Sequence, residues 1–422
     1  MPNSAQTRLQ PPMLLLLAWR NLWRNRLRTS IMLCAMVVGL MGVVVMIGFL
    51  TGMYANMINN AIAWQTSHLQ LHNKEYLLDP DITTRVVAPE PVLAKLAQLP
   101  EVTGVSARFL VQGMLASPRA SCGIRVNGVD PAAEAQVTPI ADNIIEGDWL
   151  NATGRHPIVI SEKTANRLKV RLGAKVVLTF SNADKAVSGA AFRVVGIYRS
   201  PSSSFDEGNA YVRREELSQV AGLDGVHEIA IRITDANTLS TSAAKAVEKQ
   251  LAKVVSHADV VRDWQQIQPM LATIIAQMGT SNGIILLIFI SALGLGITNI
   301  MLMAVFERTR EFGVLMAIGM VKGKVFRLIL LESLLLGLSG ALLGLALSLV
   351  VIEILAHTGI ALGNMAEGLG AFGVSTTLYP QVSFGQYLAT LAMVVIVSLV
   401  AALYPARQII KLRPVDAMSQ KH

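Results

Sequence analysis

The sequence predicts a membrane α-helical protein with four transmembrane helices and a large α+β domain inserted between helices 1 and 2. Hydrophobic residues make up 52% of the 422 residues and charged residues only 15%. The mean hydropathy is +0.49, which is too apolar for an ordinary soluble protein. Four windows also hold the roughly 20 apolar residues that a spanning helix needs. Alternating strand and helix patterns fill the long segment between the first two windows.

The four windows contain very few charged residues. Glu332 lies inside the third window and Glu353 directly after it. A carboxylate in a span usually pairs with another group or lines a wet path, so we expect Glu332 to act in packing or coupling and Glu353 to lie at the outer interface. The first window is longer than the roughly 7–15 residues of a signal-peptide core, so a span is favoured over a cleaved signal. The windows are Ile31–Leu50, Gly283–Phe306, Leu328–Ile352 and Phe384–Tyr404.

Positive charge is concentrated in three segments. Residues 1–30 contain five arginines and no acid, 307–327 contain five bases and two acids, and 405–422 contain four bases and one acid. These segments carry more than the whole net charge of +8. The distribution excludes a general nucleic-acid surface, and the positive-inside rule assigns all three segments and both termini to the cytoplasm.

The segment between the first two spans predicts an outward-facing α+β domain with a mixed sheet. "SHLQLH" has a strand pattern, "PVLAKLAQL" a helix pattern, and "HPIVISEKTANRLKVRLGAKVVLTF" a strand, a helix and a strand. A longer helix is expected over Thr238–Val254, followed by a strand at "DVV". Turns are expected at "NGVDP", "NADKAVSG" and "SPSSSFDEGN".

The connection between the second and third spans predicts an amphipathic helix from Glu307 to Gly319. Phe312, Leu315 and Met316 follow helical spacing, and Glu307 and Arg310 are an expected i, i+3 pair. Such a helix offers one face to the membrane base and another to a partner, although it could also be a plain interfacial connector. Residues 1–30 predict a second amphipathic helix in the inner headgroup layer.

Small residues in the third span predict close helix packing. Gly340, Gly344 and Ser348 follow one another at i, i+4 and i+8, and Gly337 lies beside them. Such spacing permits close approach of a second helix, so we expect packing or dimerisation along this face, with Glu332 at its end.

No residue pattern predicts an active site. Walker, H-E-x-x-H and G-x-S-x-G motifs are absent from the sequence. His68 and His72 could form a metal pair, but no third ligand is nearby, so we interpret both as polar strand residues. Cys34 and Cys122 are far apart in the sequence, and no internal disulfide is expected.

At the level of motifs, the sequence resembles a known family. "ERTREFGVLMAIGM" followed by "LLESLLLGLSGALLGLALS" is similar to the permease signature of the MacB, FtsX and LolC/LolE class of ABC transporters, the type VII or mechanotransmission group. "AWRNLWRNRLRTS" and "YPARQIIKLRPVDAM" resemble the flanks of that signature. MacB carries its ATPase ahead of the first span, where about thirty residues precede it here, and FtsX has a smaller outer loop. These departures point to the lipoprotein-releasing LolC/LolE-like branch.

The resemblance implies a permease subunit of the bacterial inner membrane without its own ATPase site. ATP-Mg would be bound by a cytoplasmic ABC ATPase dimer, and the chain itself would hold no cofactor and no metal. Further implied partners are a second permease copy or paralogue, membrane lipid, and a lipoprotein, periplasmic carrier or adaptor. Release of a lipoprotein or lipid-linked substrate is the first expectation; an FtsX-like activator of a periplasmic hydrolase and MacB-like efflux are the alternatives. The implied ATPase-coupling residues are Glu307, Arg308, Arg310, Glu311, Phe312, Gly313, Met316 and Gly319, and the implied packing residues are Gly337, Gly340, Gly344, Ser348 and Glu332.

The expected order of domains follows from the spans and the resemblance. It is a cytoplasmic amphipathic helix over 1–30, spans over 31–55, 278–306, 326–354 and 384–404, a periplasmic α+β domain over 56–277, a coupling helix over 307–325, a short periplasmic loop over 355–383 and a cytoplasmic tail over 405–422.

Overall fold

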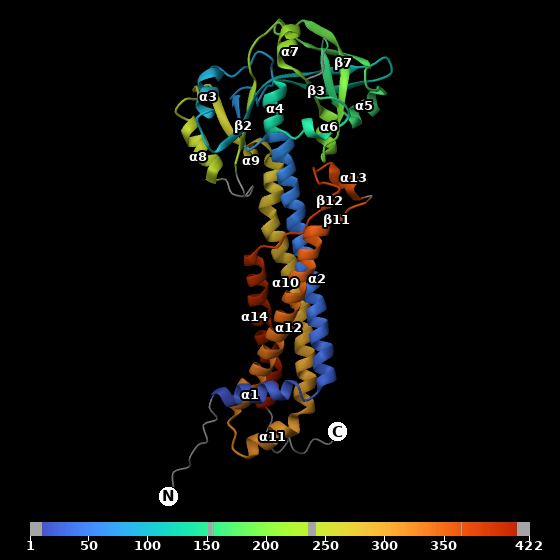
Figure 1. The fold of residues 1–422 in the computed structure, drawn as a ribbon. Coiled ribbons are helices and arrows are strands. Elements are labelled where there is room, and N and C mark those ends of the chain that lie inside the picture. The colour runs from blue at the N-terminus through green and yellow to red at the C-terminus, as the bar shows by residue number, and fades with distance from the viewer. Residues whose placement is uncertain (1–10, 151–153, 155, 235–241, 364, 412–422) are drawn as a thin grey trace. The chain divides into compact units, whose positions relative to one another are not determined.

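A computed structural model describes residues 11–150, 154, 156–234, 242–363 and 365–411. The chain divides into two compact units, each with its own hydrophobic core (Figure 1). What we call the bundle unit comprises the described residues of 1–52, 276–360 and 379–422. What we call the α/β unit comprises those of 53–275 and 361–378.

Helices build the bundle unit. Four of the described helices are long and apolar enough to cross a membrane, and they contain the four predicted windows. Helices α2, α10 and α12 have 35, 39 and 37 residues, more than the roughly 20 that a bilayer requires, and α2 and α10 continue into the α/β unit. The helices are α1 (Pro11–Leu22), α2 (Arg26–Asn60), α10 (Pro269–Glu307), α11 (Thr309–Ala317), α12 (Lys322–Thr358) and α14 (Phe384–Lys411).

The predicted N-terminal helix is divided in the structure. Within 1–30, α1 ends at Leu22 and α2 begins at Arg26. The hydroxyl of Thr29 donates to the carbonyl of Leu22 at 2.6 Å and holds the turn between them. Residues 1–10 lie outside the described part of the chain.

The predicted coupling helix is also divided. Within 307–325, α11 ends at Ala317 and α12 begins at Lys322. Gly319 takes a φ of +102°, and its amide donates to Met316 while the next amide donates to Leu315. A helix that ends on a left-handed glycine shows this pattern, so Gly319 is what ends α11.

A ten-stranded sheet organises the α/β unit. Its order is β10-β1-β9-β2-β3-β8-β5-β7-β4, and β6 pairs with β2 and β7, so that β2, β3, β8, β5, β7 and β6 close into a barrel. Strands β3 and β8 are parallel, as are β5 and β7, which confirms the predicted mixed sheet. The strands are β1 (Leu69–Asn73), β2 (Val102–Ala116), β3 (Ser121–Val129), β4 (Ile144–Gly147), β5 (Pro157–Ser161), β6 (Lys175–Ser181), β7 (Val187–Tyr198), β8 (Asn209–Arg213), β9 (Glu228–Ile233) and β10 (Asp259–Asp263).

Strand β2 belongs to two parts of this unit. Its residues Val102–Arg108 pair with β9 in a smaller sheet, β10-β1-β9-β2. Its residues Phe109–Ala116 pair with β3 in the barrel. Each part has a separate apolar core, so a movement of one part relative to the other must bend β2 between Arg108 and Phe109.

Short helices cover these strands. In the smaller sheet, apolar residues of α3 and α8 share a core with those of β1 and β9. The helices and short strands are the π-helical turn Ala61–Thr66, α3 (Pro89–Leu96), α4 (Pro131–Val137), the 3-10 turn Ala141–Asn143, α5 (Glu162–Leu168), α6 (Ser203–Gly208), α7 (Arg214–Ala221), α8 (Ser242–Leu251), α9 (Trp264–Ile267), β11 (Ile360–Ala361), α13 (Met365–Gly370) and β12 (Thr377–Leu378).

Most expected elements of the α+β segment are present. Strand β1, helix α3 and the series β5, α5, β6 lie where the patterns predicted them, and β10 contains the strand expected at "DVV". Two expected turns were wrong. "NGVDP" ends β3 and starts α4, because Asp130 accepts from Ala132 and Ala133 as an N-cap, and "SPSSSFDEGN" contains α6, capped by Ser202. The first residues of the helix expected over Thr238–Val254 lie outside the described residues.

A buried ion-pair network joins the smaller sheet to α4. Arg108 on β2 donates to Glu134 on α4 at 3.0 and 2.7 Å and to Glu228 on β9 at 2.5 Å. The hydroxyl of Ser106 donates to Glu134 at 2.6 Å. Burial would raise the pKa of Glu228, but the Arg108 guanidinium lowers it below its ordinary value. Because these residues are far apart in the sequence, no local pattern predicted the network.

Replacing Arg108 by Met should destabilise the α/β unit by about 3–5 kcal/mol, because it leaves two carboxylates buried without their cation. Hydrogen exchange of the full chain in lipid should show lost protection in β9 and α4. Arg119, exposed in the turn between β2 and β3, is the matched control, and Arg119→Met should cost less than about 0.5 kcal/mol. Equal protection in both variants would show that the network does not hold α4.

Candidate functional site

Charged side chains meet at the end of the bundle unit where α11 lies. Arg308, between α10 and α11, donates from Nη1 to both oxygens of Glu332 on α12 at 3.0 and 3.2 Å. Its Nε donates to Glu311 on α11 at 3.0 Å. Asn21 on α1 donates to Glu332 at 2.7 Å, and Arg24 in the following turn pairs with Glu311 at 2.7 Å. We call these five residues the Arg308 cluster.

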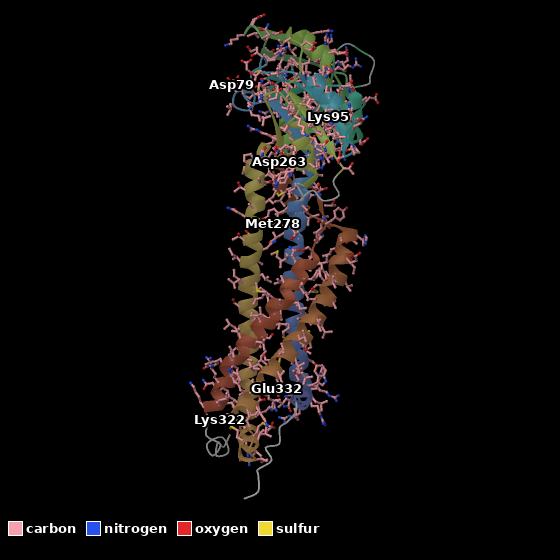
Figure 2. All side chains as sticks on the ribbon, turned by 90° about the vertical axis from the view of Figure 1, so that its left-hand side faces the viewer. Asp79, Lys95, Asp263, Met278, Lys322 and Glu332 are labelled. Carbon is pink, nitrogen blue, oxygen red and sulfur yellow. The ribbon has the colours of Figure 1, made fainter. Side chains whose placement is uncertain are left out.

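The Arg308 cluster ties α1 to α11 and α12. Glu332 is only 7% exposed and lies in the early turns of α12 (Figure 2). A buried carboxylate in a span needs a cation or donors, and Arg308 and Asn21 supply them. Arg308 also lies 5.2 Å from the centre of the Phe312 ring.

The charges of the cluster are held in place by one another. Burial would lower the pKa of Arg308, but Glu332 and Glu311 raise it above its ordinary value. Burial would raise the pKa of Glu311, but hydrogen bonds from Arg24 and Arg308 lower it below its ordinary value. Arg308 and Glu311 therefore stay ionised at neutral pH.

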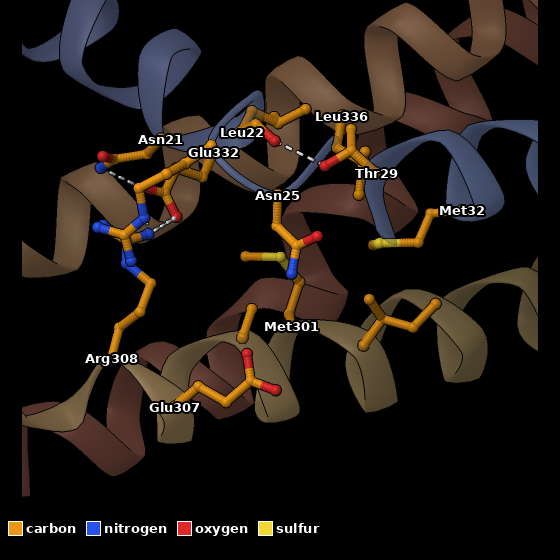
Figure 3. Close-up of a pocket in the computed structure, with 13 residues that line it drawn as sticks. Asn21, Leu22, Asn25, Thr29, Met32, Met301, Glu307, Arg308, Glu332 and Leu336 are labelled. Carbon is orange, nitrogen blue, oxygen red and sulfur yellow. Dashed lines mark hydrogen bonds and ion pairs between the residues drawn. The ribbon is translucent and has the colours of Figure 1, made fainter. Parts of the chain in front are cut away.

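A cavity of about 320 Å³ lies beside the Arg308 cluster, between the turn after α1 and the helices α10 and α12. Figure 3 shows Arg308 and Asn21 directed to Glu332 on one side, and the bond from Thr29 to Leu22 on the other. The wall is polar at Asn25 and Glu307 and apolar at Met32, Met301 and Leu336. The turn after α1 therefore lies across open space from α10.

Helix α11 and the turn that follows it expose an apolar stripe with charges beside it. Val314 is 42% exposed, Ile318 79% and Val321, just before α12, 62%. Arg310 and Glu311 are exposed next to them. Because large apolar side chains rarely gather on an exposed helix without a partner, this stripe is a candidate contact surface.

The structure separates the predicted coupling residues into two groups. Arg308, Phe312 and Gly313 face the bundle: Phe312 is 1% exposed and belongs to its core. Met316 is half-buried, whereas Gly319 and Arg310 are exposed. The i, i+3 ion pair that the structure shows in this segment is Arg308 with Glu311; the predicted pairing of Glu307 with Arg310 stays a prediction.

Sequence reasoning missed Val314, Ile318 and Val321, and also the two α1-side members of the Arg308 cluster. Val314 and Ile318 follow helical spacing from Arg310, so the periodicity of the segment contained this signal, whereas Val321 lies beyond the end of α11. Asn21 and Arg24 had no comparable signal, because their partners lie about 290–310 residues away.

The small-residue face of α12 packs against helices of the same chain. A Cβ on Gly340 would lie 3.0 Å from Met36 of α2, and one on Gly344 would lie 2.9 Å from Leu40. A Cβ on Gly337 would overlap Ser398 of α14. Glu332 and Ser348 are buried on the same helix face. This face is therefore occupied within the chain, and the expected second copy would have to meet another surface.

The histidines and cysteines do not form a site in the described residues. Nε2 of His72, in β1, bonds the Gln70 side chain at 3.0 Å, and His68 accepts from the amide of Ile233 at 3.3 Å. Cys34 and Cys122 are both free thiols.

Two family models match the chain. The MacB-like periplasmic core domain matches residues 29–250, more than half of the chain, and the FtsX-like permease C-terminal model matches residues 283–414. The chain therefore belongs to the MacB/FtsX-like family of ABC transporter permeases. The family and the four apolar helices indicate a multi-pass inner-membrane protein, and the α/β unit between the first two spanning helices matches the architecture of the family.

Individual relatives are distant. The chain is 26% identical over 430 residues to a pyoverdine export ATP-binding/permease protein of Pseudomonas entomophila, covering 96% of this chain and 59% of that protein. It is 25% identical over 363 residues to the macrolide export ATP-binding/permease protein MacB of Escherichia coli K12, covering 80% of this chain and 52% of that protein. The chain thus spans between half and two thirds of the length of these relatives.

A likeness to a solved structure is weak. The periplasmic region of MacB from Actinobacillus actinomycetemcomitans matches 51% of this chain and 97% of its own length, at 14% identity and a TM-score of 0.36. None of these findings supports the lipoprotein-releasing branch that the sequence favoured. Permeases of the family typically lack their own ATPase site, although both relatives are named ATP-binding/permease proteins.

Gly344→Leu should destabilise the chain itself by about 1–3 kcal/mol, because the larger side chain overpacks the contact with Leu40. Thermal unfolding of the purified protein measures this. Gly296 on α10 has open space around its Cβ position, so Gly296→Leu is the matched control and should be nearly neutral. If the two variants unfold at the same temperature, α2 and α12 do not pack as described.

Arg308→Gln should destabilise the bundle unit by about 3 kcal/mol, because it leaves Glu332 buried without its cation. The double variant Arg308→Gln with Glu332→Gln should lose less stability than the sum of the single variants, and a double-mutant cycle measures the difference. The exposed pair Lys163–Glu207 is the control, with a coupling below about 1 kcal/mol. Additive losses at Arg308 and Glu332 would contradict a stabilising pair.

Proposed function

We propose that this chain couples ATP hydrolysis by a cytoplasmic ABC ATPase dimer to movement of its α/β unit on the periplasmic side. The observation that carries the proposal is the exposed apolar stripe of Val314 on α11 and of Ile318 and Val321 in the turn after it. The Arg308 cluster fixes α11 to the bundle. In this proposal the stripe lies in a groove of the ATPase, which binds ATP-Mg. Both termini and α11 are then cytoplasmic, as the positive-inside rule predicts.

The contacts of α11 support transmission into the bundle. Arg308 connects α11 to Glu332 on α12, and Gly340 and Gly344 of α12 lie against α2. Helix α2 continues without a break to Asn60 in the α/β unit, and α10, which directly precedes Arg308, reaches the same unit at its other end. A displacement of α11 would therefore act on both helices that lead to the α/β unit.

The composition of the spans favours work on a substrate outside the hydrocarbon layer. Between their terminal turns, the four spanning helices contain two acidic residues, Glu332 and Glu353, and Glu307 is the last residue of α10. Glu332 is already paired with Arg308. A water-filled path for a hydrophilic substrate would need more polar residues, so in this proposal the α/β unit handles the substrate on the periplasmic side.

For the substrate we favour an exported small molecule. The relatives are named for export of pyoverdine and of macrolides, and both are compounds rather than lipoproteins. Export of a small molecule differs from the lipoprotein release that the sequence predicted. Only the resemblance supports lipoprotein release. A second permease copy and a periplasmic adaptor would complete such an exporter. Mass spectrometry of small molecules and lipoproteins that co-purify with the complex distinguishes the two substrates.

Ile318→Asp should reduce co-purification of the ATPase and ATP-dependent transport at least about tenfold, because it puts a charge into the apolar contact. The cluster and the bundle should stay folded, since Ile318 is exposed. Lys411→Asp, at the exposed end of α14, is the control and should bind the ATPase normally. Normal ATPase binding by Ile318→Asp would assign α11 to the alternative, an interfacial connector.

A further inference from the structure

At the junction between the smaller sheet and the barrel, the ring of His227 takes the place of a backbone partner. Strand β9 pairs with β2 no further than Arg108. In this register Leu110 would lie opposite Val226, two residues beyond the last pair, but the carbonyl of Val226 accepts from the amide of Val86 at 2.8 Å instead. The amide of Leu110 donates to Nδ1 of His227 at 3.0 Å. The imidazole thus closes the gap where β9 leaves β2.

The second ring nitrogen fixes the protonation state. Nε2 of His227 lies 2.8 Å from the carbonyl oxygen of Ile82, which can only accept. The ring therefore carries its proton on Nε2 and is neutral, with Nδ1 free to accept. Its relative exposure is 0%, and the rings of Phe109 and Tyr76 lie 4.6 and 5.4 Å away. A buried, neutral imidazole that holds three segments together is sensitive to a second proton.

We propose that His227 makes this junction an acid-sensitive hinge of the α/β unit. A proton on Nδ1 turns the acceptor into a donor, so the buried amide of Leu110 loses its partner and faces an N–H group. A buried donor without a partner is unfavourable. The ring then leaves its place, and β2 bends more easily between its part in the smaller sheet and its part in the barrel. At low pH the smaller sheet and the barrel are therefore less rigidly connected through β2.

Nearby groups decide when the proton binds. Burial lowers the pKa of His227 below its ordinary value, and Arg85 and His72 lower it further, while the bond to Ile82 and the charge of Asp81 oppose this shift. The hydroxyl-bearing ring of Tyr76 lies between the two histidines. In the folded state the His227 ring therefore stays neutral down to a pH below 6.5, which is the ordinary pKa of histidine.

Other groups titrate in the same range and must be separated from His227. Burial also lowers the pKa of His72, with Glu228 opposing, so both histidines reduce stability as the pH falls below about 6.5. Asp206 acts in the opposite direction, because burial raises its pKa to about 6 and the folded state takes up its proton first. Global unfolding mixes these effects, and only a local measurement at β2 isolates the hinge.

His227→Gln is the informative variant, because a glutamine side chain can accept from Leu110 and donate to Ile82 but does not titrate. The full chain in lipid nanodiscs is compared by hydrogen exchange at about pH 7.5 and about pH 5, values on either side of the histidine range. The readout is the peptide over 107–112, corrected for the intrinsic pH dependence of exchange. His72→Gln is the matched control, since it removes the neighbouring buried histidine.

In the wild type and in His72→Gln, protection of this peptide should fall about tenfold or more at the lower pH. A tenfold change corresponds to a difference of about one unit between the pKa of the histidine in the closed and in the open state. In His227→Gln it should stay constant. The same acid response in His227→Gln, or none in the wild type, would overturn the hinge. If His227→Gln does not fold, exchange of the imidazole C2 proton in the wild type measures the pKa of His227 directly, and a value at or above 6.5 would overturn the proposal.

Discussion

The carboxylate of Glu332, buried in an apolar helix, is the constraint from which the arrangement at the α11 end of the bundle follows. Such a charge is unfavourable inside a membrane protein unless a cation and further donors meet it. Arg308 can reach it because the chain leaves helical geometry between α10 and α11. The Nε group of the same guanidinium then orients Glu311, and Glu311 in turn holds Arg24. The polar contacts that hold α1 and α11 at this end of the bundle thus converge on one buried carboxylate.

The α/β unit uses buried polar groups in a comparable way. Arg108 joins two strands and a helix through Glu134 and Glu228, and His227 completes a ladder that the backbone leaves open. Both residues lie where β2 passes from the smaller sheet to the barrel. Polar contacts have directional geometry, whereas the apolar packing in the smaller sheet and in the barrel does not. The polar contacts therefore define how these two parts of the unit meet.

Some of the functional site could be predicted from local sequence. The charged segment after α10 was predicted as a helix with an outward face, because its apolar residues repeat with helical spacing. The implied coupling residues lie on both faces of this helix: Phe312 and Gly313 face the bundle, and Arg310 and Glu311 are exposed. Several faces of a short amphipathic segment fit the same spacing, and only the burial of Phe312 against the bundle selects one of them.

The sequence by itself determined the four spans, the inserted α+β segment and the need for close packing along α12, because hydropathy, strand and helix periodicity and small-residue spacing are local properties. Tertiary structure alone decided which surfaces meet. Gly340 and Gly344 accept α2 of the same chain rather than a second copy, and Glu332 finds Arg308 and Asn21. It also closed the barrel by pairing β6 with β2 and β7. These contacts join residues far apart in the chain, and their free energy depends on three-dimensional fit and shared burial, which no local pattern contains.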